Sequence, residues 1–394
     1  MAYEPRVTLG RFQMERPRFE TSQRDSLTWL AHAHTRSEAT LRATRPLHAI
    51  PHDFDHPRFL ERLRKVIERC ACSPDEVARR GHELFDFTHT RWHEMEVYDI
   101  TKSPHGKGTL ARTQFYAERV AAYFERAYAL EIEPPSDVIH VTCTGYISPS
   151  GAQTLVAKRH WGEDTRVTHA YHMGCYASLP AIRIGRGLLE SARGSRRVDV
   201  VHTELCSLHL DPAQHTPEQL VVQSLFSDGF IRYALRDAAH DRTNEPGFRV
   251  LAVEEAILPD TASAMTWMTS EWGMQMTLAR DVPERIVQGM DRLLRRLYAR
   301  ARLDFEAERR RSVYAIHPGG PRIIDRVRDA LELPESSISL SREVLLAYGN
   351  MSSATLPHIW MRMLDSPLVP EGALVASLAF GPGLTVCGGL FKKQ

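Results

Sequence analysis

Short runs of apolar and β-branched residues alternate with helical patterns along most of the chain, and this alternation is the feature that most restricts its fold. Residues 137–142, 167–173 and 248–257 each have the composition of a short buried strand. Apolar residues three and four positions apart in neighbouring segments, such as 109–130, indicate helices. Alternating strands and helices are typical of proteins with a largely buried sheet. The sequence therefore predicts the α/β class.

The same patterns divide the 394 residues into three parts. Residues 1–60 are rich in Arg, His and Pro, and we expect an N-terminal arm that is irregular apart from some helix at 26–42. Residues 61–245 and 246–394 each combine strands with helices, so the third part repeats the theme of the second. A chain of this length suits two domains or one duplicated domain.

Three further segments carry helix signals. Helical spacing covers residues 59–87, and a long helical pattern covers 282–308. A further helix is expected to open at Tyr348-Gly349-Asn350.

Composition disfavours several classes of protein. A formal net charge of +1 lacks the strongly basic footprint of nucleic-acid-binding proteins. We see neither an apolar leader near the N-terminus nor an apolar run long enough to cross a bilayer, and therefore expect a cytoplasmic protein without a membrane segment. The basic clusters 196–197 and 309–311 are interpreted as solvated surface, with a landing site for an acidic carrier protein or a coenzyme A phosphate as the alternative.

Neither a disulfide framework nor a metal site is expected. The six cysteines lie at scattered positions. His89 and His93 have the four-residue spacing that helical zinc ligands use, with His82, Asp86 and Glu94 nearby, but no second cluster completes a site.

Cys175 is the first candidate catalytic residue. It follows a strand pattern that ends at Gly174, and a helical pattern begins near Ala177. The amides and partial positive charge at a helix N-terminus favour thiolate over thiol. Cys143 and Cys206 lack this position and are interpreted from local pattern as core residues.

His317 and Asn350 are the other candidates. His317 follows the strand pattern 313–316 and precedes Gly319 and Gly320, which would let the backbone approach a ligand closely. A neutral histidine near a thiol can take its proton and create the nucleophile. The Asn350 amide could donate to a developing oxyanion, although on local pattern alone helix capping is the better explanation of an asparagine there.

Four motifs in this order resemble those of the type III polyketide synthases, the chalcone and stilbene synthase-like family. They are Met173-Gly174-Cys175-Tyr176-Ala177, Ile316-His317-Pro318-Gly319-Gly320-Pro321, Tyr348-Gly349-Asn350-Met351-Ser352-Ser353 and Phe380-Gly381-Pro382-Gly383-Leu384-Thr385-Val386. The segments 143–145, 149–151 and 225–229 fit the same pattern, and the resemblance covers roughly residues 110–394.

The resemblance implies a duplicated thiolase-like fold with five layers, α-β-α-β-α, in a homodimer. It also implies an acyltransferase with neither metal nor bound cofactor. Cys175 would hold the acyl group, while His317 and Asn350 would grip malonyl-coenzyme A as it loses carbon dioxide. The enolate would then attack the acyl group in a decarboxylative Claisen condensation that gives an α-pyrone or resorcinol-type product.

Several residues would shape the substrate cavity if the resemblance holds. Phe226 falls on a gatekeeping phenylalanine of the family, and core packing is its alternative role. Met276 replaces the second gatekeeping phenylalanine, Ser148 stands where plant members carry methionine, and Ala379 replaces a loop glycine. Other residues expected to bind substrate are Gly319, Gly320, Phe380, Gly381, Cys206 and His209. The departures disfavour a chalcone-type product and favour an aliphatic or long acyl chain.

Two alternatives stay open. A stand-alone ketosynthase could use Cys175 to accept one β-keto acyl chain and join it to a second, carried by a carrier-protein phosphopantetheine, into an α-pyrone. A thiolase-fold scaffold without turnover would leave the complete set Cys175, His317 and Asn350 unexplained.

Overall fold

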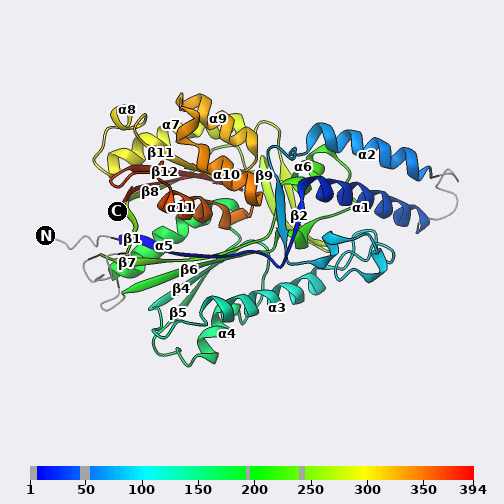
Figure 1. Ribbon diagram of the computed structural model, residues 1–394, viewed down its shortest axis with the longest axis horizontal. Helices are drawn as coiled ribbons and strands as arrows, with labels where there is room; N and C mark the ends of the chain where they lie inside the picture. Colours follow the sequence, from blue (N-terminus) through cyan, green and yellow to red (C-terminus); the bar gives the residue numbers. More distant parts are fainter. Residues whose placement is uncertain (1–6, 45–53, 192–195, 239–244) are drawn as a thin grey trace.

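The computed structural model describes residues 7–44, 54–191, 196–238 and 245–394. A nine-stranded sheet runs through the molecule (Figure 1). Its order is β11 (Val313–Ile316), β12 (Leu374–Gly381), β13 (Thr385–Lys393), β8 (Gly247–Ile257), β1 (Val7–Glu15), β7 (Gly229–Asp237), β6 (Arg197–Glu204), β4 (Asp137–Thr142) and β5 (Arg166–Tyr171). Within the described residues, three residue pairs join β1 to β8, so the sheet consists of two halves with a narrow junction.

Helices cover both halves and fill the space between them. In the middle, α5 (Ser178–Ser191) contacts strands of both halves, as does α11 (Thr355–Asp365). Helices α3 (Thr109–Ala127) and α4 (Gly151–Lys158) lie on one outer face, while α7 (Val282–Arg300) and α9 (Pro321–Leu331) lie on the other (Figure 1). Buried apolar clusters pack between these layers. The predicted α/β class and the five-layer order are confirmed.

The two halves repeat one pairing scheme. In the first, β4 pairs with β6 and β5 in parallel, and β7 pairs antiparallel with both β6 and β1. In the second, β11 and β12 are parallel, and β13 pairs antiparallel with both β12 and β8. Each half therefore places its parallel strands at the outer edge, as a duplicated fold requires.

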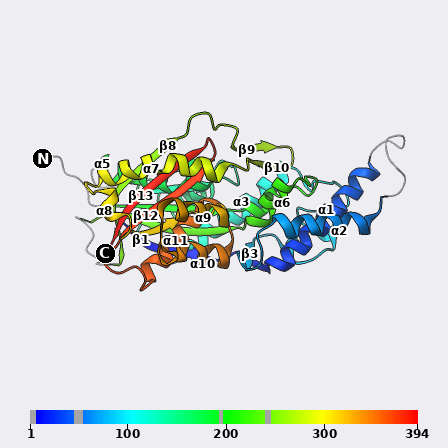
Figure 2. The same ribbon diagram turned by 90° about the horizontal axis from the view of Figure 1, so that it is seen from above.

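A helical extension lies at the end of the molecule away from the C-terminus (Figure 2). It contains α1 (Gln23–Ala43), α2 (His56–Cys70) and α6 (Pro217–Leu225), beside a small sheet of β2 (Phe19–Ser22) and β3 (Arg79–His82). In the described part of the chain, none of the helices is long and apolar enough to cross a bilayer.

Two N-terminal expectations are wrong. Instead of an irregular stretch, residues 7–15 form a strand at the junction of the two halves. The sequence does not show the regular alternation of a strand here, because the strand itself is irregular. Arg11 has φ 55°, and the register with β7 shifts between Gly10 and Gln13. The helix expected at 26–42 is confirmed, since α1 covers Gln23–Ala43. The helix predicted over 59–87 stops at Cys70, since the turn around Pro74 cannot continue it.

The C-terminal part differs from expectation in its helix ends. The pattern at 282–308 splits into α7 and the short α8 (Phe305–Glu308). No α-helix opens at residue 348; instead α10 (Ser339–Tyr348) ends there, since Gly349 has φ 72°, and α11 begins only at Thr355. Strands β9 (Met265–Ser270) and β10 (Gly273–Leu278) form a separate hairpin that the sequence did not reveal.

Candidate active site

Cys175 lies where β5 turns into the central helix α5. The chain leaves β5 at Tyr171 and makes one 3-10 turn, Gly174–Tyr176, before α5 begins. Gly174 has φ 76°, and a Cβ there would lie 2.9 Å from the Pro382 ring, so both the backbone angle and the space require glycine. This geometry holds the Cys175 side chain inside the molecule, where it is 7% exposed.

His317 enters the same region from the other half of the sheet. It follows β11, and its amide donates to the Leu378 carbonyl at 2.8 Å. The side chain is 1% exposed, yet neither Nδ1 nor Nε2 has a hydrogen-bond partner among the described residues. Burial lowers the pKa of His317 to about 3, so the imidazole is neutral at neutral pH.

Asn350 is held with its amide nitrogen free. Its Oδ1 accepts from the Ser352 amide at 2.8 Å, while Nδ2 has no partner within the described chain, although the residue is 1% exposed. The backbone of Asn350 also bridges to Leu225 and Ser227, which fixes the segment that carries Phe226. A buried amide donor without a partner is costly unless a ligand uses it.

These three residues line one cavity of about 1150 Å³, called here the large cavity. Its walls also contain the predicted substrate-binding residues Phe226, Met276, Gly319, Gly320 and Phe380. The exposed residues Arg69, Arg280 and Arg322 also line it, with the exposed Glu76 and Glu218, so it opens to solvent beside charges of both signs with arginine in excess. Gly381 is not part of this lining; a Cβ at Gly381 would collide with the Tyr176 ring.

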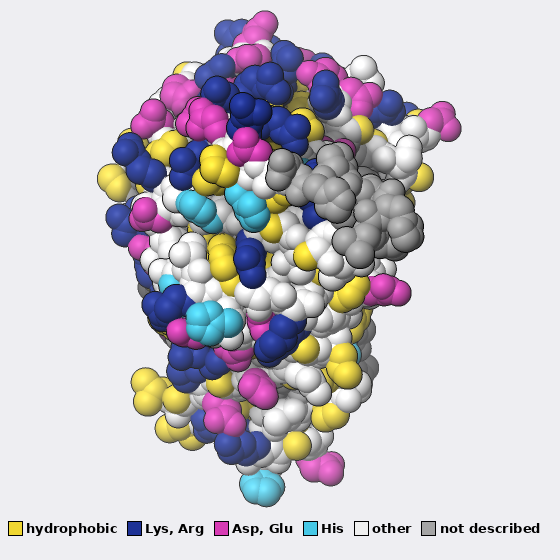
Figure 3. All heavy atoms as spheres, turned by 90° about the vertical axis from the view of Figure 1, so that its right-hand side faces the viewer, with side chains coloured by type: hydrophobic (Ala, Val, Ile, Leu, Met, Phe, Trp, Pro, Cys, Tyr) yellow, Lys and Arg dark blue, Asp and Glu magenta, His cyan; other side chains and the backbone are white. Residues whose placement is uncertain are grey.

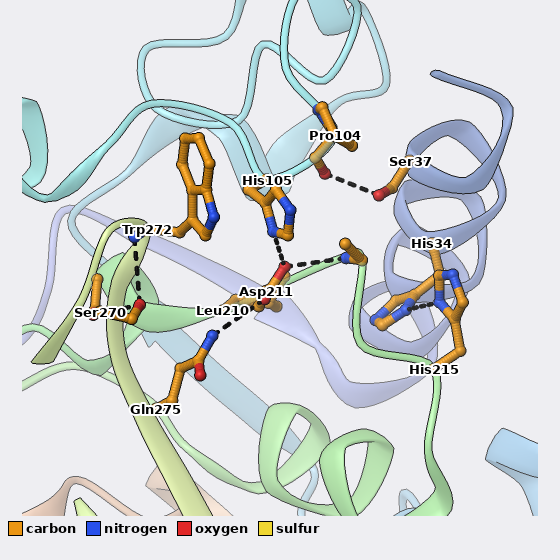
Figure 4. A network of polar contacts seen from close by, with 12 residues as sticks. His34, Ser37, Pro104, His105, Leu210, Asp211, His215, Ser270, Trp272 and Gln275 are labelled. Carbon is orange, nitrogen blue, oxygen red and sulfur yellow. Dashed lines mark hydrogen bonds and ion pairs between the residues drawn. The ribbon is translucent and has the colours of Figure 1, made fainter. Parts of the chain in front are cut away.

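A second, small cavity of about 50 Å³ meets the large one at Cys175. Cys206 and His209 line it, as expected, and Phe226 and Met276 line both cavities. The wall also includes Asp211, whose carboxylate accepts from His105 Nδ1 at 2.8 Å and from Gln275 at 3.3 Å (Figure 4). Beside it, His34 and His215 contact each other at 2.8 Å between α1 and the loop before α6 (Figure 4).

The electrostatics of Cys175 differ from the helix-end expectation. Burial raises the pKa of the Cys175 thiol to about 12, and the neighbouring Ser352 and Asn350 side chains offset this only in part. Desolvation therefore opposes the favourable field of the short helical turn at Cys175, and the position before a helix does not by itself lower the pKa of the thiol.

Sequence reasoning missed a polar chain next to Cys175. Ser352 Oγ lies 3.7 Å from Cys175 Sγ and 3.1 Å from Cys143 Sγ, and the Cys143 amide and thiol both reach the Glu204 carboxylate. Cys143 is buried, as expected of a core residue, but it also lines the small cavity. The sequence signal that could have indicated this role of Cys143 was its place in the motif 143–145.

The suggested histidine cluster does not form a metal site. His82 is buried and stacks on Phe87 with ring centroids 4.4 Å apart. Among the described residues, no group of three or more His, Cys, Asp and Glu could hold a metal ion. On the end face that carries α1 and α2, Lys and Arg side chains intermix with Asp and Glu (Figure 3), as the near-zero net charge suggests.

Two protein-family models match the chain. The N-terminal domain model of the chalcone and stilbene synthases matches residues 129–255, and the C-terminal domain model matches 249–393. Type III polyketide synthase A of Arabidopsis thaliana is 30% identical over 269 residues, which are 66% of this chain and 67% of that protein. Type III polyketide synthase C of the same plant is 28% identical over 267 residues, 66% of this chain and 68% of that protein.

Solved structures have the same fold over nearly the whole chain. The C-terminal type III polyketide synthase domain of Steely1, a type I/III hybrid from Dictyostelium, has a TM-score of 0.80 at 22% identity and covers 98% of this chain and 99% of its own. The 1,3,6,8-tetrahydroxynaphthalene synthase of Streptomyces coelicolor has a TM-score of 0.75 at 24% identity, with the same coverage.

Proposed function

Because the chain belongs to the chalcone and stilbene synthase family of type III polyketide synthases, and is thus a Claisen-condensing enzyme, we propose that Cys175, His317 and Asn350 carry its reaction. The observation behind this proposal is that one cavity is lined by the thiol of Cys175 and by three polar atoms without hydrogen-bond partners among the described residues: Nδ1 and Nε2 of His317, and Nδ2 of Asn350. Donors left free in a buried site are suited to bind a charge that develops only during reaction.

Acylation begins from the neutral pair. His317 takes the Cys175 proton as the sulfur attacks the thioester carbonyl of an acyl-coenzyme A. The bond between the acyl carbon and Cys175 Sγ forms, the bond to the coenzyme A sulfur breaks, and His317 returns the proton to the leaving thiolate. The low pKa of His317 and the high pKa of Cys175 both disfavour the ion pair, so in this proposal it is a transient species.

Condensation follows in the large cavity. Malonyl-coenzyme A loses carbon dioxide, and the resulting enolate oxygen accepts hydrogen bonds from Asn350 Nδ2–H and a His317 ring N–H. The enolate carbon attacks the acyl carbonyl, the bond to Cys175 Sγ breaks, and the product is a chain longer by two carbons on coenzyme A. We propose an α-pyrone or resorcinol-type end product.

The mouth of the large cavity suits a phosphorylated thioester. Arg69, Arg280 and Arg322 could pair with the phosphates of coenzyme A while the pantetheine arm reaches Cys175. We further propose a homodimer, as in the family, with particle mass by light scattering as the check. The cytoplasmic location remains a prediction.

Intact-protein mass spectrometry tests the assignment. Wild type and Cys175→Ala are incubated with a panel of acyl-coenzyme A thioesters, with and without malonyl-coenzyme A. We expect an adduct on wild type alone that malonyl-coenzyme A lengthens or releases. An adduct that malonyl-coenzyme A leaves untouched would favour the chain-joining ketosynthase, and an equal adduct on Cys175→Ala would remove Cys175 from its role.

A further inference from the structure

Phe226 lies at the point where helix α6 ends. It follows Leu225, the last residue of α6, with an extended backbone of φ −78° and ψ 147°. Its side chain lines both the large cavity and the small cavity. The last carbonyl groups of a helix have no partner within that helix. The direction of the Phe226 ring therefore depends on the groups that hold this helix end.

The side chain of Arg80, from strand β3, holds this helix end. Its Nη1 donates to the Gln223 carbonyl at 2.9 Å and to the Phe226 carbonyl at 3.0 Å. By sequence, the last turn of α6 contains neither Lys, Arg nor His. A cation beside the C-terminus of a helix is favourable for the helix dipole. Arg80 therefore supplies from another segment the charge and the donors that the end of α6 lacks.

The other side of the same segment is joined to Asn350. The Asn350 amide donates to the Leu225 carbonyl at 3.1 Å, and the Asn350 carbonyl accepts from the Ser227 amide at 2.9 Å. Phe226 is therefore held between Arg80 on one side and the segment of a proposed catalytic residue on the other.

Arg80 is a costly residue to bury. It is 3% exposed, and its Nε has no hydrogen-bond partner among the described residues. Burial lowers the pKa of Arg80 to about 10, so the side chain is still charged at neutral pH. A buried charge that is only partly paired lowers stability. Groups that break a rule of stability in this way are expected at functional sites.

We infer that Arg80 is a positioning residue for the condensing reaction: it fixes the Phe226 carbonyl and thereby holds the phenyl ring beside the group that reacts at His317 and Asn350. The inference rests on the proposed function. The substitution Arg80→Met removes the donors but keeps a long side chain, so the Phe226 ring should leave its place while the residues at the cavity mouth are unchanged.

The test measures carbon dioxide release from malonyl-coenzyme A, with kcat and KM determined separately. The compared proteins are wild type, Arg80→Met, Phe226→Ala, the double variant and the control Arg79→Met. Arg79 precedes Arg80 on β3, and its exposed side chain pairs with Glu20 at 2.8 Å, outside both cavities.

We expect kcat to fall at least about tenfold in Arg80→Met with KM within about twofold of wild type, since a displacement of about 1 Å can cost about 100-fold in rate. Arg79→Met should match wild type. Because Arg80 acts through Phe226, the loss should not be repeated when Phe226 is already replaced. The double variant should therefore have the kcat of Phe226→Ala.

Equal fold losses in the two backgrounds, or an unchanged kcat in folded Arg80→Met, overturn the inference and leave the proposed function intact. Melting curves identify the folded variants. If Arg80→Met does not fold, Arg80→Gln, which keeps a polar side chain in the core, replaces it in the comparison. If neither variant folds, Arg80 is a structural residue and the inference is overturned. Wild type that releases no carbon dioxide overturns the proposed function as well.

Discussion

Two pairs of residues around Cys175 use their polar atoms in opposite ways. In the large cavity, His317 and Asn350 keep buried nitrogen atoms without hydrogen-bond partners among the described residues. In the small cavity, His209 Nε2 lies 2.8 Å from the Thr144 carbonyl, and Trp267 Nε1 donates to the Cys143 carbonyl. Free donors are suited to chemistry, whereas paired groups fix a shape. The comparison teaches that nitrogen atoms free to meet a reacting group and groups that fix the shape of the cavity lie in separate walls of one site.

The sharpest way to break this comparison is to remove the free donor of Asn350. In Asn350→Ala, release of carbon dioxide from malonyl-coenzyme A should fall about 10²–10³-fold, as for loss of one oxyanion donor. Acylation of Cys175 should persist, since it does not need the enolate contact. The two steps are measured separately, by carbon dioxide release and by intact mass.

Asn350→Asp serves as the matched control. An aspartate keeps the oxygen that accepts from the Ser352 amide but loses the donor. A similar loss of decarboxylation in both variants assigns the effect to the donor. If only Asn350→Ala is impaired, Asn350 merely positions the Ser352 segment, and loss of acylation in both would contradict its assigned role.

The sequence predicts a site residue when the residues next to it in the chain determine its position, and fails when distant segments determine it. Cys175 and His317 stand just after strand patterns, so four short motifs suffice to find them. Trp267 lies opposite Met276 in a hairpin, and it donates a hydrogen bond to the carbonyl of Cys143, which is 124 residues away in sequence. No local sequence pattern encodes either contact.

The fold was predictable to a similar extent. The strands of residues 137–257 and 313–391 carry continuous apolar runs, and they were found. β1 was missed because Gly10 and Arg11 interrupt its pattern, although both of its edges are paired in the sheet. A strand defined by its two partners, rather than by its own composition, is visible only once those partners are assembled.

Removing one paired and one free histidine and measuring the free energy of unfolding is a second way to sharpen the comparison. His209→Ala should lower the free energy of unfolding by about 3 kcal/mol, because it leaves the Thr144 carbonyl and the Met274 amide unpaired. His317→Ala breaks no side-chain hydrogen bond among the described residues and faces a cavity, so we expect a change of less than about 1 kcal/mol. Urea unfolding at pH 7 measures both. Equal losses would mean that the free and paired histidines do not differ as the structure indicates.

The pH dependence of the same His317→Ala variant gives the smallest expected effect. Burial holds the pKa of folded His317 at about 3, below its ordinary value of 6.5. Between these values the unfolded chain binds a proton that the folded chain does not, so stability falls as the pH drops from 6.5 towards 3. The variant lacks this group. Relative to wild type it should therefore gain about 2 kcal/mol between pH 7 and pH 5. The other buried histidines, including His209, act equally in both proteins and cancel in the difference. Urea unfolding at the two pH values measures this difference in stability. Parallel pH curves for the two proteins would show that folded His317 takes up its proton as readily as the unfolded residue does. That result would contradict the neutral imidazole from which the proposed acylation step begins.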